Sequence, residues 1–87
     1  MTNLTDLYST AKDEFEIAAE ETEKKTVYAA EDREAAKEAL ATLKDAYEKA
    51  VRESDPETAR EVQTRTGPRI KELENALVAV EEMAMED

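Results

Sequence analysis

The chain has 87 residues, and its 23 acidic and 12 basic side chains give a formal net charge of −11. A chain of this length folds as one small domain with a modest core. It contains no cysteine and no histidine, so it lacks the usual ligands of zinc, haem and iron–sulfur clusters and the Ser–His and Cys–His nucleophile pairs. We therefore expect a single domain over residues 1–87 that is not an enzyme and holds no cofactor or metal.

The composition also limits the partners and the compartment. The first residues lack the basic and apolar stretches of a secretory signal, and no segment approaches the roughly 18 apolar residues of a membrane span. We expect a soluble protein of the cytoplasm or the nucleus that does not contact membranes. Its negative charge repels nucleic acid and favours a partner protein with a basic surface.

Residues 1–53 contain neither glycine nor proline and are rich in the strongest helix formers. They predict one long helix over about residues 3–53, with Asn3 as its N-cap. Its apolar positions alternate in steps of four and three, the heptad spacing of a helix with one buried face. These positions, which we call the seam, hold Leu4, Tyr8, Ala11, Phe15, Ala18, Thr22, Lys25, Ala29, Asp32, Ala36, Ala39, Leu43, Ala46 and Ala50. The polar residues in the middle of the seam predict that this part is poorly buried or bent.

A turn is predicted at residues 54–56, followed by a second helix over about residues 56–86. Asp55 is suited to cap this helix and Pro56 to occupy its first position. The helix contains Gly67 and Pro68, which predict a kink or a break that acts as a hinge. The seam keeps its phase across that point through Ala59, Val62, Thr66, Ile70, Leu73, Leu77, Val80 and Ala84.

These elements predict an all-α fold, an antiparallel helical hairpin or coiled-coil-like bundle. A hairpin that turns at residues 54–56 leaves residues 3–22 without an opposing helix. This overhang carries four large apolar side chains, Leu4, Leu7, Tyr8 and Phe15. Such side chains should not remain exposed to water. We therefore expect them to pack against a second copy of the chain in a homodimer. The alternative is a monomeric three-helix bundle, in which the chain folds back near residues 22–26. That segment contains no Gly, Pro, Asn or Asp, the usual turn residues, which favours the continuous helix.

Four carboxylates share one face of the first helix at helical spacing. We call them the acidic stripe, and they are Asp13, Glu16, Glu20 and Glu23. They predict a surface for a basic partner. The leading hypothesis is a non-enzymatic protein-interaction module that acts as an adaptor, an assembly factor or a small inhibitor. The alternatives are a phage-type acidic mimic of nucleic acid that inhibits a basic nucleic-acid-binding protein and, less favoured, a structural or scaffold rod.

Overall fold

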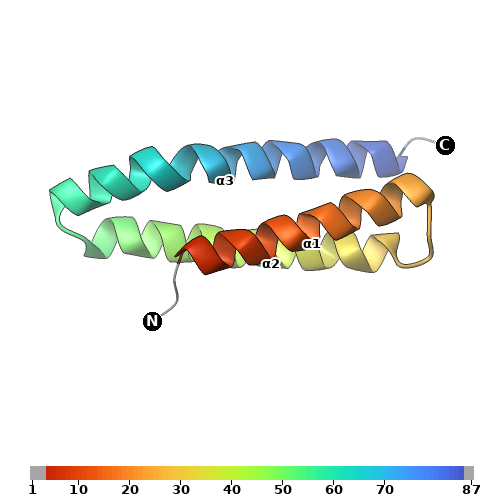
Figure 1. The fold of residues 1–87 in the computed structure, drawn as a ribbon, viewed down its shortest axis with the longest axis horizontal. Helices are drawn as coiled ribbons and strands as arrows, with labels where there is room; N and C mark the ends of the chain where they lie inside the picture. Colours follow the sequence, from red (N-terminus) through yellow and green to blue (C-terminus); the bar gives the residue numbers. More distant parts are fainter. Residues whose placement is uncertain (1–3, 86–87) are drawn as a thin grey trace.

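The computed structural model describes residues 4–85, and these residues form three helices and no strand. Helix α1 spans Leu4–Lys24, α2 spans Ala29–Glu53 and α3 spans Pro56–Met85. Consecutive helices run antiparallel and pack into an elongated three-helix bundle (Figure 1). The all-α prediction is confirmed, in the form of the three-helix alternative. Asn3, the predicted N-cap, lies outside the described residues.

The predicted continuous helix over residues 3–53 is wrong at residues 25–28, where the chain turns. The Lys25 N–H donates to the Thr22 carbonyl and the Thr26 N–H to the Glu21 carbonyl, both at 3.1 Å. This pair of bonds is a Schellman motif, which usually places glycine in the left-handed conformation. Here Lys25 occupies it, with φ of 58°. The chain folds back here without a glycine because the packing of α1 against the other helices offsets the free-energy cost of the left-handed conformation of Lys25.

The second turn and the start of α3 agree with the prediction. The Thr58 N–H donates to Asp55 Oδ1 at 3.1 Å, so Asp55 caps α3. Of the two alternatives predicted at residues 67–68, a kink or a break, the break is absent, because α3 is continuous with Pro68 inside it. Pro68 removes the helical partner of the Thr64 carbonyl, but both residues are exposed, so water can satisfy that carbonyl.

The buried residues lie on the predicted seam or beside it. The core cluster consists of Ala11, Ala18, Ala36, Leu40, Leu43, Ile70, Leu73 and Leu77. The four side chains predicted to self-associate, from Leu4 to Phe15, pack partly buried against this cluster within the same chain. Their exposure was the reason for expecting a dimer, and the third helix removes that reason.

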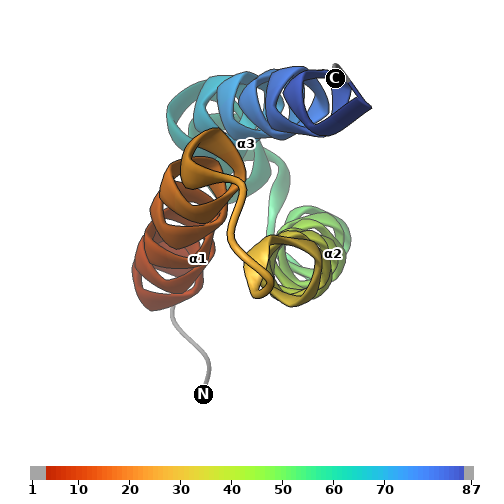
Figure 2. The same ribbon diagram turned by 90° about the vertical axis from the view of Figure 1, so that its right-hand side faces the viewer.

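Helix α1 is the shortest of the three and covers only part of the α2–α3 hairpin (Figures 1 and 2). Its first turns reach the level of Arg69, whose guanidinium carbon lies 6.0 Å from the Tyr8 ring centroid. Beyond this level the hairpin continues as two helices, and no residue from 44 to 69 is buried. We call residues 44–69 the hairpin tip.

Candidate interaction surface

All four residues of the acidic stripe are exposed on α1, as the helical spacing predicts. Near its C-terminal end, the Lys24 ammonium lies 2.8 Å from the Glu20 carboxylate. This hydrogen bond and the attraction between the charges lower the pKa of Glu20 and raise the pKa of Lys24. The structure thus places the four carboxylates of the stripe on one accessible face of α1.

Beside the stripe, α1 and α3 enclose a small groove of about 140 Å³. We call it the α1–α3 groove, and it is lined by Tyr8, Lys12, Phe15 and Glu16 of α1 and by Glu72, Leu73 and Ala76 of α3. Leu73 is buried and Phe15 half-buried, whereas Glu16 and Glu72 are exposed. The groove therefore combines an apolar lining with a carboxylate from each helix and the ammonium of Lys12 from α1.

Sequence reasoning identified Glu16 but missed Glu72. The two residues are far apart in the chain, and only the packing of α3 against α1 brings them to the same groove. No sequence pattern pointed to Glu72. The favoured hairpin paired the segment that forms α3 with the segment that forms α2, and left most of α1 unpaired.

The net charge is distributed unevenly over the molecule. The hairpin tip contains six acidic and six basic residues, so the whole net charge of −11 belongs to the rest of the chain. The acidic surface is therefore concentrated where the three helices pack together, and the projecting tip is neutral overall. A basic partner would be attracted to the three-helix part.

Gly67 and Pro68, which were predicted to form a hinge, lie within the continuous helix α3. A Cβ at Gly67 would lie 3.0 Å from the Tyr47 hydroxyl oxygen. The absence of a side chain at Gly67 therefore allows α2 and α3 to approach closely at this level.

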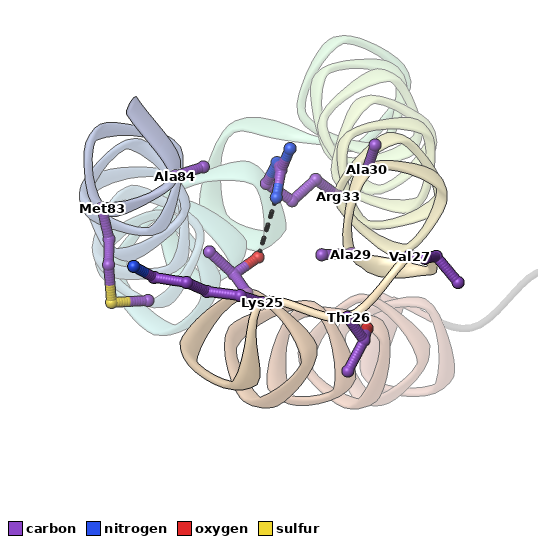
Figure 3. Close-up of a pocket in the computed structure, with 9 residues that line it drawn as sticks. Lys25, Thr26, Val27, Ala29, Ala30, Arg33, Met83 and Ala84 are labelled. Carbon is purple, nitrogen blue, oxygen red and sulfur yellow. Dashed lines mark hydrogen bonds between the residues drawn. The ribbon is translucent and has the colours of Figure 1, made fainter. Parts of the chain in front are cut away.

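At the opposite end of the bundle from the tip, a hollow of about 350 Å³ lies between the α1–α2 turn and the end of α3 (Figure 3). Arg33 Nη1 donates to the hydroxyl of buried Thr22 at 3.0 Å, which ties α2 to the end of α1. Lys25 and Met83 also line the hollow. Over residues 4–85, no group of three or more His, Cys, Asp or Glu side chains could hold a metal ion.

In the described part of the chain, no helix combines the length and apolarity needed to cross a membrane. The fold and its surface define a small three-helix bundle domain with an acidic face. The chain belongs to the family described as the embryogenesis-like protein helical domain, whose model matches residues 1–82. No curated protein and no solved structure matches it.

Proposed function

We propose that this domain is a non-enzymatic protein-interaction module whose α1–α3 face binds a basic segment of another protein. The observation that carries the proposal is the α1–α3 groove, which is lined by the apolar side chains of Phe15 and Leu73 together with the carboxylates of Glu16 and Glu72. Such a groove suits a ligand with one apolar anchor flanked by cations. The adaptor, assembly-factor and inhibitor roles all require a surface of this kind.

The partner segment that fits best is an amphipathic helix with Lys or Arg beside its apolar residues. A helix that lies along a groove presents anchors three or four residues apart, and Glu16, Glu20 and Glu23 repeat with the same spacing along α1. Charge complementarity of this type increases association rates and excludes acidic competitors. The neutral hairpin tip adds little attraction of its own, which directs a basic partner toward α1.

The test is affinity capture from the native host, with three immobilised proteins compared by quantitative mass spectrometry. The groove variant carries Glu16→Lys and Glu72→Lys, and a matched control carries Glu38→Lys and Glu53→Lys. The control residues are exposed on α2 and change the net charge equally. A true partner should bind the wild type and the control alike. It should bind the groove variant about tenfold more weakly, which corresponds to a loss of about 1.4 kcal/mol of binding free energy.

Equal retention by the groove variant and the control would contradict the proposal. A captured nucleic-acid-binding protein that duplex DNA displaces would instead support the nucleic-acid mimic. Retention that is independent of the charge changes would favour a structural role for the rod.

A further inference from the structure

The α1–α2 turn contains none of the residue types that usually form turns. Its four residues, 25–28, include no Gly, Pro, Asn or Asp. Lys25 adopts the left-handed conformation, with φ of 58°, which an L-residue other than glycine, asparagine or aspartate rarely visits. A continuous helix through residues 22–29 would remove this strain.

The buried positions keep one helical phase across the turn. Thr22 at the end of α1 and Ala29, Ala36 and Leu43 in α2 are all buried, and each lies seven residues after the one before. A turn leaves the phases of the two helices independent, so a match arises by chance about once in 3.6 cases, the number of residues per turn. A single helix through residues 4–53 would instead require this match.

The turn also exposes apolar surface. Val27 is 87% exposed and Tyr28 is 63% exposed. If two copies of the chain crossed antiparallel at this segment, Tyr28, which shares a helix face with Lys25 and Asp32, would meet the other copy. The same crossing, centred between residues 28 and 29, would place Lys25 of each copy opposite Asp32 of the other, an attractive pair of charges.

We propose that a second copy of the chain exchanges α1 with the first, forming a domain-swapped dimer. In it, α1 and α2 join into one helix, and each α1 packs on α2 and α3 of the other copy. The exchange preserves the contacts between α1 and the rest of the bundle, so the two states differ mainly at the turn. Short, strained connections of this kind favour swapping. The inference does not depend on the proposed function, since it concerns only contacts within the bundle.

Distance measurement by pulsed electron resonance tests the exchange directly. The chain has no cysteine, so Thr10→Cys and Asp45→Cys, both at exposed positions, carry the only spin labels. Labelled chains are diluted with an excess of unlabelled chains, so that only distances within one chain are observed. In the closed monomer α1 lies against α2, and the labels should be on the order of 15 Å apart. In the swapped dimer 35 helical residues should separate them by roughly 52 Å.

Two substitutions at one position serve as a matched pair. Lys25→Gly and Lys25→Ala remove the same charge, but only glycine relieves the left-handed strain of the turn. Relief of this strain in the monomer should weaken dimerisation about tenfold for each turn. Because a dimer has two turns, we expect light scattering to show dimerisation about a hundredfold weaker for Lys25→Gly than for Lys25→Ala.

The expected result is a long distance in the dimer fraction, favoured by Lys25→Ala and suppressed by Lys25→Gly. Three results would overturn the proposal: a short distance within the dimer fraction, equal dimerisation of the two variants, or monomers for all proteins up to millimolar concentration. Circular dichroism of both variants establishes that each remains folded, and glycine at this position is compatible with the observed turn.

Discussion

Gly67 illustrates how one residue can serve close packing at the expense of helix stability. It lies inside α3, and its φ is not positive, so its backbone does not require glycine. A Cβ there would lie 3.0 Å from the Tyr47 hydroxyl oxygen and 3.8 Å from its Cζ. That hydroxyl is the far end of a half-buried side chain, which can move by a few tenths of an ångström.

We therefore expect Gly67→Ala to stabilise the protein. Alanine in a helix interior is favoured over glycine by about 0.5–1 kcal/mol, and the displacement of the Tyr47 hydroxyl offsets part of this gain. Urea unfolding gives the change in the free energy of unfolding. In a Tyr47→Phe background the contact is absent, so the gain should be larger there. Destabilisation by Gly67→Ala in both backgrounds would show that the helix spacing itself cannot adjust.

The start of α3 depends on one carboxylate. Asp55 accepts hydrogen bonds from Thr58, and these bonds lower the pKa of Asp55. A carboxylate whose pKa is lower in the folded state stabilises that state above its unfolded pKa. This contribution disappears as the pH falls through the folded pKa, because the protonated group is a poorer acceptor.

Asp55→Asn retains a capping side chain without the titration. We expect the wild type to have the higher melting temperature at pH 7, and the difference to shrink or reverse as the pH falls through the lowered pKa of Asp55 and the carboxylate becomes protonated. Asp45→Asn, an equal loss of charge at an exposed position of α2, serves as the control. A wild-type advantage that persists unchanged at the acidic pH would mean that the cap does not act through its charge.

The bundle as a whole is well packed at one end only. Within residues 4–85, all buried residues lie in α1, between Ala29 and Leu43 of α2 and between Ile70 and Val80 of α3, whereas the hairpin tip has none. Segments with little buried apolar surface open locally at low free-energy cost. The tip should therefore unfold partially without loss of the three-helix part.

Hydrogen exchange followed by mass spectrometry can test this difference. We expect amides of residues 46–66 to exchange at least tenfold faster than those of residues 32–43 and 70–80, since about 1.4 kcal/mol of opening free energy changes the rate tenfold. Leu43→Ala should accelerate exchange in the three-helix part, because it removes a fully buried side chain at a cost of about 2–5 kcal/mol. Uniform protection along α2 and α3 would contradict this account of the tip.

The sequence by itself determined the helical class, the turn at Asp55 and the identity of most buried positions. These follow from local chemistry, because helix propensity, the capping carboxylate and the heptad spacing act over a few residues. The seam positions from Ala11 to Val80 could be predicted in this way, and so could the exposure of the acidic stripe. What the same spacing leaves open is whether the chain continues straight or folds back at Thr22.

Only the tertiary structure decided that point. Left-handed geometry at Lys25 costs about 1–2 kcal/mol, whereas each large apolar side chain left in water forgoes roughly 1.5–3 kcal/mol. Leu4, Leu7 and Phe15 together outweigh the strain once α1 packs on α2 and α3. The same packing brings Glu72 to the groove that Glu16 lines. The residue types near the turn cannot predict the fold-back, because the contacts that offset the strain at Lys25 are made by side chains elsewhere in the chain.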